Sequence, residues 1–557
     1  REQEAKAVYY ACRWNLKPSD PAAFAAGKLT TPERPIVFYV DDTFPAGWYD
    51  AIRRGLLSWN AAFEKIGYRD AVQVRPYPRD DASFDPNDIK FSCVKYANTM
   101  GESLSSSARI DPRSGEILSA TICIPHNVTS RIRTDLFVQL GAADPDARRV
   151  KMSPELFGKA LAADVARHTG ACLGLAVNYA GSYCVPVDSL RSPSFTQRYG
   201  ISASIMDELP YNLVAQPGDK ERGVALMQQG PGVYDEYVVD WLYRPVPGAA
   251  TPEDEVAELD RRIAARRSDP MCLYTPPPVA VALDPRSMPY NLGDDPVRAA
   301  AYEFANYAYV MKHADEWIGE EDADYTFRSL VQASVMNQLY YAFVSVSANL
   351  GGVYLNEKYE GDALPTYLSV PRDLQRRALR FMLERLEDMS WLDNERLNKD
   401  VVEVVSLGEY CRDMLSDVIF KSLSTLDLSA SKSDDPYTQD LLLINVIRNA
   451  GVVTQTRRSA ASASAFAGET LPDAAALSRL AKMARVFPEM TSDPVSGVLP
   501  MRSVAFLVRP AVDYKRYGML LDMKKLYRNA LGTSASERMK NHYRYMLLAI
   551  DRALKVD

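Results

Sequence analysis

Histidine is scarce in this chain of 557 residues, which has only four: His126, His168, His313 and His542. They lie far apart in the sequence, so a histidine-based metal site would need nearly all of them to converge. Seven cysteines are present, and none belongs to a Cys-x-x-Cys pair, which argues against a zinc ribbon or a thioredoxin-type redox site. An odd number of cysteines also leaves at least one thiol outside any intramolecular disulfide.

Long apolar runs and an excess of basic residues are missing as well. No apolar stretch approaches the ~18 residues that a membrane-spanning helix needs. A net charge of −7 argues against the basic surface typical of nucleic-acid binding. We therefore expect no transmembrane segment in this chain and no nucleic-acid partner. Because the chain starts at Arg1 without a methionine or a signal-like segment, we expect a processed or truncated form.

The patterns that are present predict an α+β fold over the first half of the chain. An apolar, β-branched run at Pro35–Val40 predicts a buried strand, and apolar residues every three or four positions predict a helix over Ala46–Ile66. Further strands are expected at Ala71–Val74, Ile89–Tyr96 and Ile117–Ile124.

A long helix is expected to begin at Ser153-Pro154, as N-cap and first helical residue. Phe157, Leu161 and Val165 follow with a spacing of four, which predicts one buried face.

Two domains are expected from the length and from a change of pattern. Residues 1–320 form the α+β domain, with a Pro-rich wrapping segment over residues 244–296 and a helix from Asp295-Pro296 to about Trp317. Residues 321–557 form an α-helical domain. Its expected helices are Thr326–Leu350, Arg372–Asp388, Glu409–Leu426, Thr438–Ala450, Ala474–Phe487 and Ala535–Leu554, with a short hairpin around Val353–Tyr359.

Three stretches carry a resemblance to a known family. The chain has Leu173-Gly174-Leu175 followed by Asn178, then VPVDSLRSPSFTQRYG at Val185–Gly200 and SIMDELPYNLVAQPGD at Ser204–Asp219. Together they resemble a family of secreted zinc-dependent metalloproteases common in Bacteroidota. The resemblance implies a metzincin-like fold, with a twisted mixed sheet, an active-site helix and a Met-turn at Met206, and a helical C-terminal region.

The residues that should bind zinc depart from that family. A metzincin site needs H-E-x-x-H-x-x-G-x-x-H, because histidines four apart share one helix face and the glycine turns the chain back to the metal. Aligned on the Leu-Gly-Leu anchor, the three histidine positions hold Arg167, Ala171 and Val177, and the glutamate position holds His168. An arginine stays protonated and has no lone pair for a cation. Zinc is expected in the family, and we predict neither a metal ligand nor an intact catalytic residue here.

Several alternatives stay open at these positions. A register shifted by one residue would make His168 and Cys172 zinc ligands, and the same pair could form a nucleophilic dyad. The simpler interpretation of Cys172 is a small buried residue. Arg167 would either pair with Asp164 and fill the former metal cavity, or anchor a peptide carboxylate. Met206 could be an ordinary core methionine, but the sequence SIMD at Ser204–Asp207 favours the Met-turn.

Peptide binding is the remaining use of such a site. The strand Ile117–Ile124 is expected beside the cleft, where the equivalent edge strand of metzincin-like folds pairs with an extended substrate. It would then be either a peptide-binding edge or a covered one. The candidate peptide-binding residues are Arg167, His168, Ile117, Leu118, Ser119, Ala120 and Thr121.

These observations predict a catalytically inactive metalloprotease homologue, a pseudo-peptidase that binds peptides or proteins or serves as a scaffold in a cell-envelope complex. The resemblance implies an extracytoplasmic location, in the periplasm or at the cell surface, with a possible lipid anchor ahead of Arg1. One alternative is an active metallopeptidase with ligands drawn from His126, His168, Asp164 or Cys172. Another is a purely structural subunit whose cleft is filled by its own side chains.

Overall fold

The computed structural model describes residues 10–276, 283–356, 358, 365–397, 406–442, 444–445, 512–533 and 537–554. The chain forms two compact units. The first comprises Arg1–Val279 and Arg286–Ala342, and the second comprises Ala280–Pro285 and Phe343–Asp557. The domain boundary after residue 320 stays a prediction.

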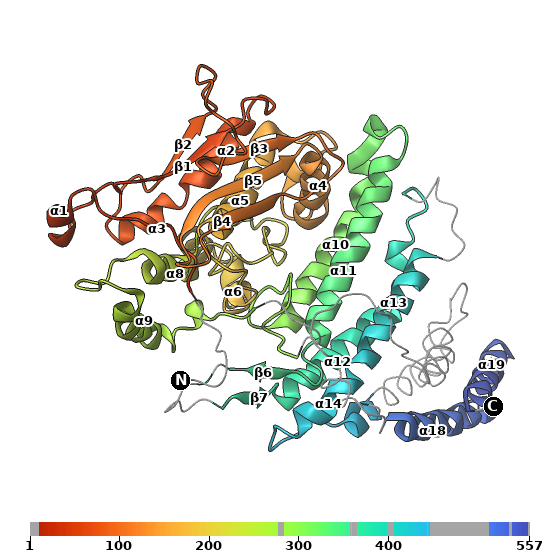
Figure 1. The fold of residues 1–557 in the computed structure, drawn as a ribbon. Coiled ribbons are helices and arrows are strands. Elements are labelled where there is room, and N and C mark those ends of the chain that lie inside the picture. The colour runs from red at the N-terminus through yellow and green to blue at the C-terminus, as the bar shows by residue number, and fades with distance from the viewer. Residues whose placement is uncertain are drawn as a thin grey trace. The chain divides into compact units, whose positions relative to one another are not determined.

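A five-stranded mixed sheet organises the first unit (Figure 1). In spatial order its strands are β2 (Val72–Pro76), β1 (Ile36–Val40), β3 (Ser92–Ala97), β5 (Ile117–Pro125) and β4 (Ser105–Ile110). The first four are parallel to one another, and β4 runs antiparallel to β5. The predicted mixed sheet is therefore confirmed.

The prediction that Ile117–Ile124 forms the edge strand is wrong. This strand, β5, pairs with β3 on one side and with β4 on the other, so its backbone is engaged in the sheet. The edge belongs to β4, whose residues are mostly exposed. An added strand needs unpaired backbone groups, so only β4 could accept one at this end of the sheet.

Two helices pack on one another and against the sheet: α2 (Trp48–Leu57) and α5 (Pro154–Cys172). They cross closely at Gly55, where a Cβ atom would lie 2.5 Å from the carbonyl oxygen of Ala162. The single helix predicted over Ala46–Ile66 is instead two, because α3 (Asn60–Lys65) starts anew after Ser58 and Trp59. The Asn60 side chain there bonds both the N–H and the carbonyl of Val72, at 2.8 and 2.9 Å.

The other helices of the first unit surround this core. They are α1 (Pro21–Ala25), α4 (Val128–Asp135), α6 (Ala180–Tyr183), α7 (Pro193–Tyr199), α8 (Val233–Tyr243), α9 (Pro252–Arg266), α10 (Pro296–Ile318) and α11 (Thr326–Ser347), whose last residues belong to the second unit. The predicted cap of α10 is confirmed, since the Asp295 carboxylate accepts the N–H of Arg298 at 3.2 Å. Within the described chain, no helix combines the length and apolar character required to cross a bilayer.

The second unit is largely helical. It contains the hairpin β6 (Val353–Leu355) and β7 (Tyr367–Ser369), and the helices α12 (Arg372–Glu387), α13 (Leu407–Lys421), α14 (Leu423–Ala430), α18 (Val512–Thr533) and α19 (Glu537–Leu554). The helix predicted at Ala474–Phe487, and residues 446–450 of the one predicted at Thr438–Ala450, lie outside the described residues.

Candidate functional site

Helix α5 carries the candidate site and begins where the sequence predicts. The Ser153 hydroxyl accepts the N–H of Leu156 at 3.1 Å, and Pro154 occupies the first turn. Leu161 and Val165 are fully buried, which holds the helix against the sheet. The Trp59 indole donates to the carbonyl of Ala166 at 2.8 Å, so a buried side chain also fixes the helix at mid-length.

Met206 lies directly against this helix. A Cβ atom at Gly170 would overlap the Sδ of Met206 and would lie 2.6 Å from the Trp59 ring, so only glycine permits this contact. The chain then turns away at Gly174, whose φ is +92°, and a Cβ there would overlap the carbonyl oxygen of Cys12. Helix α5, the glycine turn and the buried methionine therefore pack against one another.

The side chains at the presumed zinc positions cannot hold zinc. Arg167 and Ala171 lie four residues apart on α5, and Val177 follows the glycine turn. Arginine cannot donate a lone pair, and alanine and valine have no donor atom. Among the residues that the structure describes, no group of three or more His, Cys, Asp or Glu side chains is arranged to hold a metal ion.

His168 joins α5 to the edge strand. Its Nε2 lies 3.2 Å from Nη2 of Arg167, and its Nδ1 lies 3.0 Å from the hydroxyl of Ser106 on β4. A guanidinium can only donate, so Nε2 accepts and Nδ1 carries the proton. Burial, reinforced by the positive charge of Arg167, lowers the pKa of His168 to about 4, so the ring is neutral at pH 7.

The geometry does not pair Cys172 with His168 as a ligand or nucleophile, because both ring nitrogens of His168 bond other groups. Burial also raises the pKa of the Cys172 thiol to about 12, which keeps it protonated and unreactive. The simpler interpretation, a small buried core residue, fits its 1% exposure.

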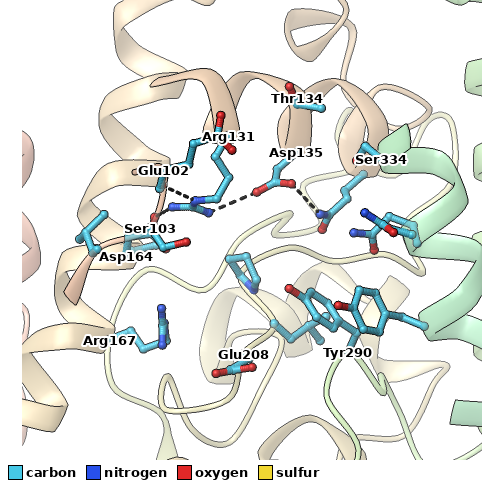
Figure 2. Close-up of a pocket in the computed structure, with 18 of the residues that line it drawn as sticks. Glu102, Ser103, Arg131, Thr134, Asp135, Asp164, Arg167, Glu208, Tyr290 and Ser334 are labelled. Carbon is cyan, nitrogen blue, oxygen red and sulfur yellow. Dashed lines mark hydrogen bonds and ion pairs between the residues drawn. The ribbon is translucent and has the colours of Figure 1, made fainter. Parts of the chain in front are cut away.

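The expected ion pair between Asp164 and Arg167 is not formed. Asp164 instead accepts a hydrogen bond from Arg131 on α4, and Arg131 also donates to Asp135 at 3.2 Å (Figure 2). Asp164 lies on the side of α5 that faces α4, where the partly buried guanidinium of Arg131 is available. Arg167 therefore has no carboxylate partner among the described residues, and it donates a hydrogen bond to His168.

A cavity of about 680 Å³ opens beside these groups (Figure 2). Its walls come from α4, the π-helical segment η1 (Leu136–Leu140) that continues it, α5, the loop after Met206, and α11. The lining includes two residues predicted from sequence, Arg167 and His168. It also includes residues that sequence analysis missed, among them Glu102, Arg131, Asp135, Gln139, Asp207, Glu208, Tyr290, Gln338 and Tyr341.

The predicted residues Ile117, Leu118, Ser119, Ala120 and Thr121 lie on β5 and do not line the cavity. One signal could have found Asp207 and Glu208, since both directly follow Met206 in the resembling motif. No local pattern marks the residues from α11.

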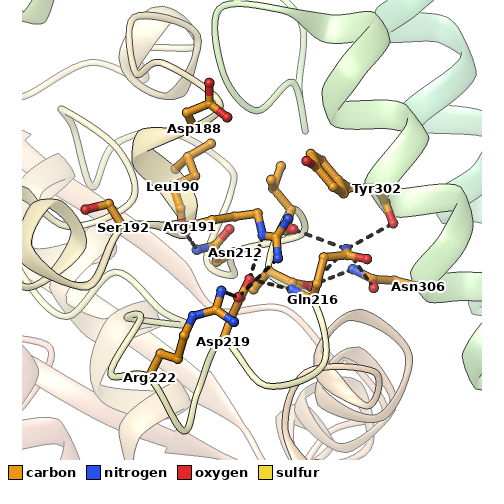
Figure 3. A network of polar contacts seen from close by, with 12 residues as sticks. Asp188, Leu190, Arg191, Ser192, Asn212, Gln216, Asp219, Arg222, Tyr302 and Asn306 are labelled. Atoms are coloured by element: carbon orange, nitrogen blue, oxygen red, sulfur yellow. Dashed lines mark hydrogen bonds and ion pairs between the residues drawn. The ribbon is translucent and has the colours of Figure 1, made fainter.

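The loop after Met206 is fixed by a buried polar network (Figure 3). The Asp219 carboxylate is fully buried and accepts hydrogen bonds from Arg191, at 2.8 and 3.3 Å, and from Arg222. Gln216 donates to Asn306 on α10 at 3.0 Å, and Asn306 in turn bonds the loop backbone. The two resembling motifs, SLRSPS and NLVAQPGD, therefore meet through Arg191 and Asp219, which holds the cavity wall in place.

The comparison with known families agrees with this geometry. A family model described as Met-zincin matches residues 149–448, which is more than half of the chain and includes α5 and Met206. No curated protein and no solved structure matched the chain. The match over residues 149–448 shows that this chain belongs to the Met-zincin family.

Proposed function

We propose that this chain is a catalytically inactive Met-zincin homologue that binds a peptide or protein segment in the former active-site region. The observation that carries the proposal is a contrast at α5 and the turn after it, between the packing and the side chains expected to bind zinc. Gly170, Gly174 and Met206 keep the close packing of a metal-site scaffold, whereas Arg167, His168, Ala171 and Val177 stand where zinc ligands and the general base would be. Zinc hydrolysis needs a metal-bound water and a carboxylate base, and these side chains supply neither.

Binding is supported by the surface beside α5. Strand β4 is the sheet edge, and His168 ties it to the helix through Ser106. Among the described residues, the backbone of β4 pairs only with β5, so the outer side of β4 could pair with an extended peptide. The cavity of about 680 Å³ next to Arg167 would then receive a side chain of that peptide.

Two other functions are possible outcomes of the test. An active metallopeptidase would need ligands from His126, His168, Asp164 or Cys172, and Asp164 is already bonded to Arg131. A purely structural subunit would have its cleft filled by its own side chains, and the open cavity favours binding instead.

Metal analysis of the purified chain tests the loss of catalysis. We expect far less than one zinc per chain after dialysis. We also expect no metal-dependent cleavage of a mixture of fluorogenic peptide substrates. Near-stoichiometric zinc, with cleavage abolished by a chelator, would establish the active metallopeptidase instead.

A repair experiment tests the alignment itself. The combined substitutions Arg167→His, His168→Glu, Ala171→His and Val177→His should create a three-histidine site that binds one zinc tightly. The matched control keeps Ala171 and so lacks one of the three donors; it should bind zinc much more weakly. A quadruple variant that is folded by circular dichroism but takes up no zinc would show that the register is wrong.

We also propose an extracytoplasmic location, in the periplasm or at the cell surface, as part of an envelope complex. The support is the resemblance to secreted Bacteroidota metalloproteases, and the relationship to that narrower group stays a prediction. Fractionation of the source cells, with the chain found in the cytosolic fraction, would overturn this location.

A further inference from the structure

Three buried oxygen atoms of residues that line the cavity have no hydrogen-bond partner in the described part of the chain. They are Oε1 of Gln139, Oδ1 of Asp207 and Oε1 of Gln338. These side chains are only 4%, 3% and 6% exposed, and they come from three separate elements. Leaving a buried polar group unsatisfied destabilises the fold. Three such residues in the wall of one cavity favour an occupant that supplies hydrogen-bond donors.

The charges around the cavity favour the same kind of occupant. Five carboxyl groups line it, from Glu102, Asp135, Asp164, Asp207 and Glu208, against two guanidinium groups, from Arg131 and Arg167. Arg131 is engaged by Asp135 and Asp164, and the Glu208 carboxylate accepts a hydrogen bond from the hydroxyl of Tyr179 at 3.0 Å. The excess of carboxyl groups makes the cavity attractive to a cation.

Asp207 adds to this preference. One of its oxygens accepts the N–H of Ser182 at 2.8 Å, while the other is the unpartnered Oδ1. Burial raises the pKa of Asp207 to about 8. A cation bound beside it would offset that burial and favour the ionised carboxylate.

An aromatic pair forms another part of the wall. The rings of Tyr290 and Tyr341 stack with their centroids 4.4 Å apart. Tyr290 holds a left-handed backbone, with φ of +60°, which is strained for a non-glycine residue. Such strained residues gather at functional sites, and an aromatic face binds a guanidinium by cation–π attraction.

We propose that the cavity binds the guanidinium group of an arginine side chain, which bonds Glu208, Asp207 and Gln338 and stacks on the pair of Tyr290 and Tyr341. A guanidinium has five donors in one plane, which suits several acceptors around an aromatic wall better than an ammonium does. Arg167 enters the cavity from α5, away from Tyr290 (Figure 2). Its Nη2 bonds His168, and its remaining donors could bond a carbonyl or carboxylate of the same ligand. This inference rests on the proposed peptide binding, since the arginine is presented by the bound peptide.

The test compares arginine with citrulline, which has the same shape without the charge. The full chain is titrated with capped pentapeptide libraries, Ac-X-X-Arg-X-X-amide and Ac-X-X-Cit-X-X-amide, in which X is any uncharged residue. The readout is the rise in unfolding temperature, from which the average affinity follows. We expect the arginine library to bind about tenfold more tightly, as for a charge-assisted hydrogen bond.

The outcomes separate this inference from the proposed function. Equal binding of the two libraries would overturn the guanidinium site and leave peptide binding intact. Binding of neither library would overturn both. N-acetylarginine amide is the third probe; if it binds as tightly as the arginine library, the cavity takes a free guanidinium compound and presentation by a peptide is overturned.

Variants locate the site. Glu208→Gln should remove most of the preference for arginine while the citrulline library binds as before, because only the charge-dependent contact is lost. Tyr341→Leu is a second, independent variant that should also weaken the arginine library selectively. The control Glu64→Gln removes an exposed carboxylate on α3 that does not line the cavity, and it should keep the full preference. A full preference in folded Glu208→Gln and Tyr341→Leu would place the guanidinium elsewhere.

Discussion

His168 lies at the position that the resemblance gives to the catalytic glutamate, and its surroundings keep it from acting as a base. His168 accepts from Arg167 and donates to Ser106, so neither ring nitrogen is directed at a substrate. Because burial lowers its pKa to about 4, the folded protein resists protonating a ring that an unfolded chain would protonate near pH 6.5. The residue therefore works as a neutral link between α5 and β4.

This link predicts a pH dependence of folding. The unfolded chain binds a proton at His168 near pH 6.5 and the folded chain only near pH 4. Stability is therefore lost as the pH falls through that window, by roughly 3 kcal/mol. His168→Gln should remove this loss, which urea unfolding of both proteins at several values between pH 4 and pH 6.5 would measure. Parallel curves for the two proteins would show that the ring is not buried as described.

At the scale of elements, the turn after α5 depends on one glycine. Gly174 has φ of +92°, and its Cβ position is occupied by the backbone of Cys12, which cannot move aside as a side-chain end could. Gly174→Ala should lower the free energy of unfolding by roughly 3 kcal/mol or more, from backbone strain and overlap together. Gly27→Ala is the matched control, because Gly27 has φ of +76° with open space around it. It should lose only about 1 kcal/mol. Equal losses in chemical denaturation would mean that the overlap with Cys12 contributes nothing.

Local signals explain which elements could be predicted. Ser153 and Pro154 mark the start of α5, and Gly174 marks its end, because capping and left-handed turns depend on a few neighbouring residues. The order of strands is different, since a strand's own residues show which face is buried and not which partner lies beside it. That is why β5 was assigned to the edge that belongs to β4.

The candidate site divides in the same way. Arg167, His168 and Met206 could be placed from a motif on consecutive residues. The opposite wall, with Gln338 and Tyr341 from α11, forms only because segments far apart in the sequence pack together. No pattern within α11 predicts it. The partner of Asp164 could not be predicted for the same reason. Arg131 lies 33 residues away in the chain, on α4, and bonds Asp164 on the neighbouring helix α5.

For the whole molecule, buried carboxyl groups set how stability responds to pH. Burial raises the pKa of Asp207 and of Glu303 to about 8, and the pKa of Asp235 to about 7. All three are 3% exposed or less. In the unfolded chain such groups lose their protons near pH 4. Between pH 4 and pH 8 the folded protein thus holds more protons than the unfolded one, so stability falls as the pH rises.

This loss of stability with rising pH has the opposite sign to the effect of His168. The effect of His168 acts below pH 6.5 and comes from one group, whereas three carboxyl groups cause the loss. We therefore expect the free energy of unfolding to fall by several kcal/mol between pH 6.5 and pH 8, where the carboxyl groups act alone. Urea unfolding at steps across that range would measure it. Glu303→Gln should flatten the curve, because an amide cannot lose a proton, and Glu303 lies on α10 outside the cavity lining, so the arginine preference should not change. Stability that stays level from pH 6.5 to pH 8 in the wild type would mean that these carboxyl groups are already ionised in the fold.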